Sequence, residues 1–301
     1  MENIKISSID NYQLSLNIYN VEYPKGYIQV LHGMQEHQNR YKDLALYLNQ
    51  HGYTVITSDM RSHGENAVEL GYFKEKDGYK FLLEDQKTIT KYIKKNFNTN
   101  KVIILAHSMG TIIARNLLQT ESFDYEKMIL SGYPNYQAAV KAGILIGKLI
   151  QMIKGGKHKS NLLHNLSVGS FNKKIKNPKT NLDWLSVNEE NVNKYIEDPL
   201  CGFPFKTSAF IDLFTLLSKM NNFKKTDDVN DIPLLLIAGQ NDPCVGGKKG
   251  KENSIKALNK VHFTKIFNID YPNMRHEIFN EINNIKVYED IVSFLGGDTV
   301  E

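Results

Sequence analysis

A serine stands between an apolar run and a helix-like segment in "KVIILAHSMGTIIARNLL", residues 101–118. The run from Val102 to Ala106 is typical of a buried strand. Ala106 and Gly110, two positions to either side of Ser108, are small and permit the sharp strand-to-helix turn that exposes a nucleophilic serine. The spacing therefore favours Ser108 as a nucleophile. The alternative is an ordinary loop serine that caps the next helix.

A serine nucleophile needs a histidine base and an acid that orients the histidine. In a strand–helix fold with this turn, the acid and then the histidine follow the serine, each after a late strand. Asp242 follows the apolar segment 232–239, and His276 follows the segment 263–270. Asp270 is the alternative acid, but it lies only six residues before the histidine. We therefore expect a Ser108–His276–Asp242 triad.

A developing oxyanion needs two backbone N–H donors, one after the serine and one after an early strand. The segment "VLHGMQEHQNRY" (30–41) supplies the second loop, and Gly33 lets its backbone approach closely. We expect the N–H groups of Met34 and Met109 to form the oxyanion hole. The alternative for His32-Gly33 is a plain turn at the end of a strand.

The elements that position these residues alternate between apolar strands and helices. Near-continuous apolar strands alternating with helices indicate a mostly parallel sheet covered on both faces. Strands are expected at 13–21, 26–33, 53–60, 101–108, 125–132, 232–239 and 263–270. Helices are expected at 40–52, 78–97, 109–120, 248–260 and 277–295, which places His276 at the start of the last helix.

The alternation stops between residues 134 and 228, where no convincing strand occurs. This stretch holds two apolar helix candidates, 137–154 and 208–220, with a polar segment rich in Asn and Lys between them. We predict an α/β core made of residues 1–133 and 229–301. Residues 134–228 are predicted to form an inserted helical cap above the carboxyl ends of the strands, where a site is expected.

The first helix of the predicted cap, 137–154, has two interpretations. Its apolar residues begin at Ala138, and Lys141, Lys148 and Lys154 recur at roughly helical spacing. In the first interpretation the helix is buried and the lysines extend outward to water. In the second it forms a lid surface that contacts a membrane transiently or binds an acyl chain.

Composition limits the partners and the compartment. The chain has 301 residues, 41% hydrophobic, and a net charge of +4, too small to indicate nucleic-acid binding. It lacks the ~18 consecutive apolar residues of a membrane span, and its first residues lack the apolar block of a secretory signal. Cys201 and Cys244 do not form a disulfide framework, so a reducing cytoplasm is expected. The oligomeric state is not indicated.

Neither a metal nor a cofactor is expected. His32, His37, His63 and His107 lie near the motifs, but none belongs to an H-E-x-x-H pattern and no CxxC pair occurs. The segment "GGKKGKE" (246–252) lacks the pattern of a phosphate-binding loop. Arg61 and His63 are expected to brace the loops around the serine.

Five segments together carry a family resemblance: "HGMQEHQNRY", "SDMRSHGEN", "AHSMG", "GQNDPCVG" and "MRHEIFNE". They resemble the monoacylglycerol lipase and lysophospholipase branch of the α/β-hydrolases, from about Gly26 to the C-terminus. Across the predicted cap the resemblance is weak, although "EDPLCGF" (197–203) is similar to a segment of bacterial members. Ala106 and Ser62 depart from the family, which usually has glycine at both positions.

The resemblance implies the same triad and the same oxyanion donors. It implies hydrolysis of a carboxylic ester of a single-acyl-chain lipid, such as a monoacylglycerol or a lysophospholipid, without a cofactor. Three alternatives remain open: a small-ester carboxylesterase, a peptidase of the same fold, and a protein that binds ligands without catalysis.

Overall fold

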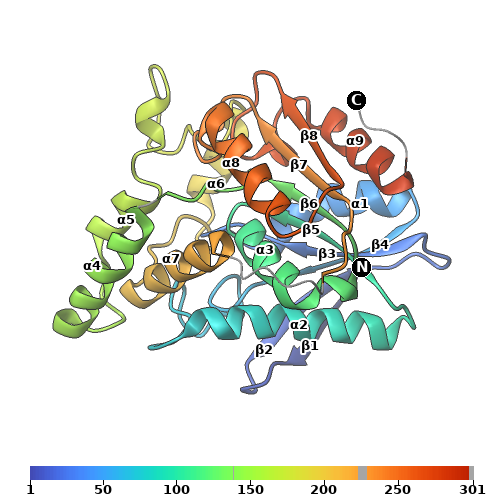
Figure 1. Cartoon of the computed structure of the whole chain (residues 1–301), viewed down its shortest axis with the longest axis horizontal. Coiled ribbons are helices and arrows are strands. Elements are labelled where there is room, and N and C mark those ends of the chain that lie inside the picture. Colours follow the sequence, from blue (N-terminus) through green and yellow to red (C-terminus); the bar gives the residue numbers. More distant parts are fainter. Residues whose placement is uncertain (138, 223–228, 298–301) are drawn as a thin grey trace.

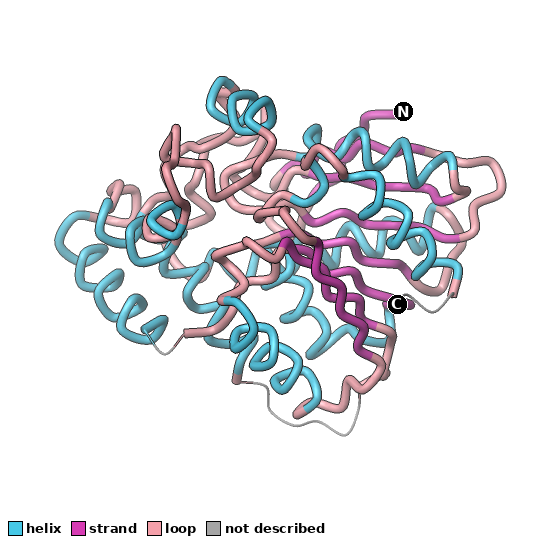
Figure 2. Tube along the Cα trace, turned by 90° about the horizontal axis from the view of Figure 1, so that it is seen from above, coloured by secondary structure: helices cyan, strands magenta, loops and turns pink. Residues whose placement is uncertain are grey.

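The computed structural model describes residues 1–137, 139–222 and 229–297, which contain an eight-stranded sheet with helices on both faces (Figures 1 and 2). The strands are β1 (Glu2–Ser7), β2 (Gln13–Tyr19), β3 (Gly26–Leu31), β4 (Tyr53–Ser58), β5 (Val102–His107), β6 (Tyr125–Ser131), β7 (Leu234–Gly239) and β8 (Ile266–Tyr271). Their order in the sheet is β1-β2-β4-β3-β5-β6-β7-β8. β1 and β2 run antiparallel to their neighbours, and the pairs from β4 to β8 are parallel. The predicted mostly parallel α/β fold is confirmed.

Two layers of helices bury the sheet. α1 (Lys42–Gln50) and α9 (Asn284–Gly296) pack on one face, and α2 (Gly78–Asn96), α3 (Met109–Glu121) and α8 (Gly247–Asn259) pack on the other. Side chains of β5 alternate between the layers: Ile104 joins the α3 side and Leu105 the α1 side. Because both faces are covered, β4, β5 and β7 are buried along their whole length, which explains their apolar sequences.

Helices without intervening strands occupy the described part of the predicted cap. They are α4 (Ala139–Lys154), α5 (Asn161–Ser167), α6 (Glu189–Glu197) and α7 (Thr207–Asn221). Figure 1 shows α4, α5 and α7 together at one side of the sheet. The short helices α5 and α6 lie in the polar stretch for which no helix was predicted. Ala138 and the predicted boundary near residue 228 lie outside the described residues, and the division into core and cap stays a prediction.

The expected helix at 277–295 begins later than predicted. α9 starts at Asn284, and a 3-10 turn (Ile278–Asn280) precedes it. The reason lies in the contacts of residues 275–281: the Glu277 N–H donates to Leu185 O, and the Glu281 carboxylate accepts from the Arg275 N–H. These bonds to the cap and within the loop outweigh local helix propensity, so His276 lies in a loop rather than at a helix start.

Across the described residues, none of the helices is both long enough and apolar enough to cross a membrane.

Candidate active site

Ser108 occupies the strained turn between β5 and α3. Its backbone has φ 50° and ψ −116°, a conformation that residues other than glycine adopt rarely. Gly110 makes the turn possible, because a Cβ on this residue would lie 2.2 Å from Leu31 O. Within the described residues the Ser108 side chain forms no cap bond to α3. Its hydroxyl is directed instead to a histidine.

His276 contacts both of its expected partners. Its Nε2 lies 2.9 Å from Ser108 Oγ, and its Nδ1 lies 2.8 Å from Asp242 Oδ2. All three residues follow strands at the same edge of the sheet: Ser108 follows β5, Asp242 follows β7, and His276 comes after β8. The chain of contacts has the geometry that transfers a proton from a serine hydroxyl to an oriented imidazole.

Asp270, the alternative acid, lies in a different environment. Its carboxylate is paired with Lys251 Nζ. The second oxygen of Asp242 accepts the Cys244 N–H at 2.7 Å, which fixes the carboxylate toward the histidine. The structure therefore joins Asp242, and not Asp270, to His276.

Burial alone would lower the pKa of His276, because the ring is shielded from water. The charge of Asp242 and its hydrogen bond outweigh burial, so the pKa of His276 lies above its ordinary value. The neighbouring His107 ring lies 4.7 Å from the His276 ring between centroids, and among the described residues it forms no hydrogen bond with a carboxylate. Burial lowers the pKa of His107 to about 3. His276 is therefore suited to accept a proton and His107 stays neutral.

The loop that follows β3 carries the expected oxyanion donor Met34. The Gly33 N–H donates to Glu36 Oε1, and the Gln35 N–H donates to His63 Nε2 at 3.3 Å. In the described parts of the chain, the N–H groups of Met34 and Met109 donate no intramolecular hydrogen bond. Both residues line the same cavity as Ser108. The flanking bonds fix the loop, and Met34 and Met109 remain the predicted oxyanion donors.

Two buried histidines, His32 and His63, connect this loop to the loop that follows β4. His32 Nε2 accepts the Met60 N–H at 2.9 Å, and His63 Nδ1 donates to Arg61 O. Burial lowers the pKa of His32 to about 4 and that of His63 well below its ordinary value, so both rings are neutral. The Arg61 guanidinium binds Asp85 and Asp10, which ties the next loop to α2. These contacts agree with the bracing expected of Arg61 and His63.

A buried charge network, which the sequence did not indicate, connects the two loops of the site. The Arg40 guanidinium donates to Glu36 Oε2 at 2.8 Å and to both oxygens of Glu277, at 2.7 and 2.6 Å. Asn191 of α6 also donates to Glu277, at 2.6 Å. Burial alone would raise the pKa of Glu277, but the charge and the hydrogen bonds of Arg40 outweigh burial and lower this pKa to about 2. The network links the loop after β3, the histidine loop and α6.

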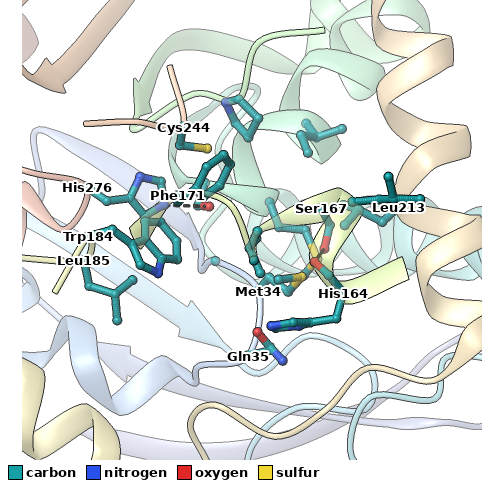
Figure 3. Close-up of a pocket in the computed structure, with 18 of the residues that line it drawn as sticks. Met34, Gln35, His164, Ser167, Phe171, Trp184, Leu185, Leu213, Cys244 and His276 are labelled. Atoms are coloured by element: carbon teal, nitrogen blue, oxygen red, sulfur yellow. Dashed lines mark hydrogen bonds between the residues drawn. The ribbon is translucent and has the colours of Figure 1, made fainter. Parts of the chain in front are cut away.

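A cavity of about 390 Å³ opens at Ser108 (Figure 3). Apolar side chains form much of its wall, including Met34, Ile112, Leu213, Phe214 and Leu217. In Figure 3, Trp184 and Leu185 lie beside His276, and Leu213, His164 and Ser167 lie at the opposite end. The volume falls in the range of small-molecule sites.

Trp184 is a site residue that sequence reasoning missed. Its ring lies 4.9 Å from the His276 ring between centroids, and 8% of the residue is exposed. It comes from the polar stretch between α5 and α6. The available signal was that this stretch contains the one tryptophan of the chain.

One further cluster unites residues from two of the quoted segments. His37 Nε2 and Asp198 Oδ2 form a pair at 2.8 Å, and the Cys201 sulfur lies within 4.8 Å of these atoms. The pair ties the loop after β3 to the segment "EDPLCGF". Cys201 and Cys244 are both free thiols.

Comparison with known proteins places the chain in a family. Residues 22–283 match the sequence profile of the family described as serine aminopeptidase, S33. The chain belongs to the serine aminopeptidase S33 family. This match covers most of the α/β-hydrolase core together with the predicted cap.

Two lipases and an esterase are among the proteins similar to this S33 chain. It is 24% identical to human monoglyceride lipase over 86% of this chain and 82% of the relative. It is 26% identical to a monoacylglycerol lipase of Mycolicibacterium smegmatis over 90% and 88%. A thermostable carboxyl esterase from Bacillus coagulans, solved in complex with glycerol, superposes with a TM-score of 0.88 at 25% identity, covering 98% of both chains. The predicted resemblance to the monoacylglycerol lipase branch is confirmed.

Proposed function

We propose that this protein is a serine hydrolase that cleaves carboxylic esters of single-acyl-chain lipids, with monoacylglycerol as the favoured substrate. The observation that carries the proposal is the Ser108–His276–Asp242 contact chain at the mouth of a largely apolar cavity. The relatives named above as lipases and as a carboxyl esterase support ester hydrolysis as the class of reaction.

The proposed mechanism assigns one role to each residue. His276 Nε2 takes the Ser108 proton as Oγ attacks the ester carbonyl carbon, and Asp242 stabilises the imidazolium that forms. The Met34 and Met109 N–H groups stabilise the oxyanion, and each such donor contributes roughly 3 kcal/mol. His276 then protonates the leaving alcohol. Water attacks the acyl-enzyme by the same steps and releases the fatty acid.

The apolar lining of the cavity indicates that the acyl chain is the part of the substrate with the most extensive contacts. Leu213, Phe214 and Leu217 of α7 line the cavity together with Ile112 of α3. Trp184 covers the His276 ring and limits access of water to it. A chain placed among these side chains would bury its methylenes at about 0.8 kcal/mol each.

The charge of the cavity wall favours a neutral headgroup. Among the described residues that line the cavity there is no lysine or arginine to pair with a phosphate. Asn135, Ser167 and Asn181 line it and offer neutral hydrogen-bonding groups to glycerol hydroxyls. A monoacylglycerol therefore fits this wall better than a lysophospholipid does.

The same wall disfavours a peptidase that recognises a free amino terminus. Such an enzyme needs an acidic group available for the ammonium of its substrate. The carboxylates that line the cavity, Glu36 and Glu277, are both bound by Arg40. The family description alone therefore does not favour aminopeptidase activity over ester hydrolysis.

We also propose that the predicted cap contacts a membrane surface transiently. The helix α4 exposes Leu145, Leu149, Met152 and Ile153 to solvent. This arrangement favours the lid-surface interpretation of residues 137–154 over that of a buried helix. A lipid ester would reach the cavity from an aggregate through such a surface.

Two assays test the proposal. Labelling with a fluorophosphonate reports an activated serine, and we expect rapid labelling that Ser108→Ala abolishes. Hydrolysis of monooleoylglycerol is then compared with that of lysophosphatidylcholine and an aminoacyl 4-nitroanilide, and we expect monooleoylglycerol to give the highest kcat/KM. If the wild type is not labelled, the result would indicate a protein that binds ligands without catalysis. A higher rate on the nitroanilide would indicate a peptidase, and activity confined to acetate esters would indicate a small-ester esterase.

A further inference from the structure

The excess of positive charge in the chain comes from one segment of the predicted cap. Residues 139–182 contain nine lysines and neither Asp nor Glu. With 37 basic and 33 acidic side chains in total, the rest of the chain has 28 and 33, a net charge of −5. Each of the nine lysines is exposed. The remainder of the chain is therefore net acidic, and α4, α5 and the segment that follows present a basic surface.

The same segment carries a group of exposed apolar residues. On α4, Leu145, Leu149, Met152 and Ile153 are between 48% and 76% exposed, and they recur at the spacing of one helix face. Leu162 and Leu166 of α5 are 53% and 49% exposed. Lys141 and Lys148 flank the apolar face of α4, four residues before Leu145 and three after it.

The packing of α4 explains why its large side chains face outward. Two glycines of α4 lie against α7: a Cβ on Gly143 would lie 3.0 Å from Phe214 Cδ2, and one on Gly147 2.7 Å from Ile211 Cγ1. Because a large side chain does not fit at these two positions, the side of α4 with the glycines packs closely on α7, and Leu145, Leu149 and Met152 lie on the solvent side. Figure 1 shows α4 and α5 at the edge of the molecule away from α9.

This surface is continuous with the cavity. Leu166 is half exposed and also lines the cavity, together with Val140 of α4. A lipid held at the surface would therefore have a short path to Ser108. This continuity distinguishes a lipid surface from an acidic protein as the partner, because a protein partner would have no use for an adjoining acyl cavity.

We propose that α4, α5 and the lysines of residues 139–182 form a docking surface specific for anionic lipid bilayers. The apolar residues enter the interface and the lysines bind the negative headgroups. The inference rests on the proposed function for its link to the cavity, but bilayer binding itself is independent of catalysis. Lys157 and Lys179 already pair with Glu69 and Glu189, so Lys141 and Lys148 are the sharper targets.

Co-sedimentation of the full chain with vesicles tests the charge requirement. We expect at least tenfold stronger partitioning to phosphatidylcholine vesicles with about 30% phosphatidylglycerol than to pure phosphatidylcholine vesicles at low salt, and loss of the difference at high salt. A lysine near an anionic surface contributes about fivefold, so Lys141→Gln with Lys148→Gln should weaken partitioning roughly 25-fold. The matched pair Lys91→Gln with Lys95→Gln, exposed at the far end of α2, should change it little.

The apolar contribution is tested separately. Leu145→Ser with Leu149→Ser should weaken partitioning to both types of vesicle. Equal partitioning of the wild type to both vesicle types, or equal effects of the two lysine pairs, would overturn the proposal. So would self-association of the wild type that Leu145→Ser abolishes without any vesicle binding, because the occupant would then be a second copy of the chain.

Hydrolysis of a soluble ester separates this inference from the proposed function. The lysine variants should hydrolyse p-nitrophenyl butyrate at the wild-type rate, and they should lose activity on monooleoylglycerol embedded in anionic vesicles. A wild type that binds anionic vesicles but hydrolyses neither ester would contradict the proposed function and leave the docking surface supported.

Discussion

Arg40 binds Glu277, a residue 237 positions later in the chain, through both oxygens of its carboxylate. Glu277 adjoins His276, and Arg40 also binds Glu36, whose carboxylate accepts the Gly33 N–H beside Met34. One guanidinium thus positions the loop of the proposed base relative to the loop of a proposed oxyanion donor. Its planar fork is suited to this task in a way that a lysine is not.

We predict that Arg40→Lys lowers kcat on a soluble ester by about 100-fold and changes KM little, because small misplacement of reacting groups has effects of this size. The variant should also lose stability, since a buried carboxylate is left incompletely paired. Arg61→Lys is the matched control, because Arg61 also binds two carboxylates but contacts neither loop through its side chain. A similar loss of kcat in both variants would show that Arg40 acts through stability alone.

The strained turn at Ser108 leads us to expect different effects on activity from substitutions at its two small neighbours. Gly110→Ala should destabilise the fold by about 3 kcal/mol and abolish activity, because its Cβ would overlap Leu31 O. Ala106→Gly restores the residue usual in the family and should cost about 1 kcal/mol through backbone entropy while activity is retained. Thermal unfolding and ester hydrolysis measure both effects. Full activity of Gly110→Ala would contradict the proposed geometry of the turn.

The pH dependence of kcat/KM should report His276. The imidazole must be neutral to accept the Ser108 proton, so activity is lost as pH falls through the pKa of His276, which Asp242 holds above its ordinary value. Asp242→Asn removes that charge, so the acid limb should move to lower pH while kcat falls about 10⁴-fold. Asp270→Asn should leave the limb and kcat unchanged, because Asp270 pairs with Lys251. The reverse pattern would identify Asp270 as the acid.

The apolar end of the cavity should set the acyl chain length. Leu217→Trp adds a large ring to the wall formed by α7, so activity on long-chain p-nitrophenyl esters should fall at least tenfold. Activity on the acetate ester should remain and serves as the internal control, since a short acyl group does not reach this wall. An equal loss on acetate and palmitate would indicate damage to the triad or to folding instead of a shortened cavity.

β2 to β8 and the proposed triad were accessible from the sequence because their signals are local, whereas β1 (Glu2–Ser7) was not predicted. Apolar runs such as Val102–Ala106 mark buried strands, and Ser108 and Asp242 each follow one. His276 comes after β8, an edge strand in which only Tyr271 is buried. The fold expected from the strand-to-helix turn at Ser108 gave the order of the three residues, and the resemblance to known hydrolases implies the same triad. For these elements the predicted and observed positions differ mainly at the ends, where tertiary contacts decide which residue is the last.

The remaining parts of the site depend on contacts between distant segments. Glu277 looks like the start of a helix, but its backbone and side chain bind Leu185, Arg40 and Asn191. Trp184 lies in a polar stretch, and only the path of the predicted cap brings it to His276. The outward apolar face of α4 likewise follows from the fit of Gly143 and Gly147 against α7, which helical periodicity alone does not reveal.

Hydrolysis of p-nitrophenyl esters from acetate to palmitate by the wild type and by Ser108→Ala tests the central claim most directly. We predict that the wild type prefers medium or long chains and that Ser108→Ala loses the activity while it retains the wild-type melting temperature. Equal activity of the two proteins would contradict the account, because Ser108 would then not be the nucleophile.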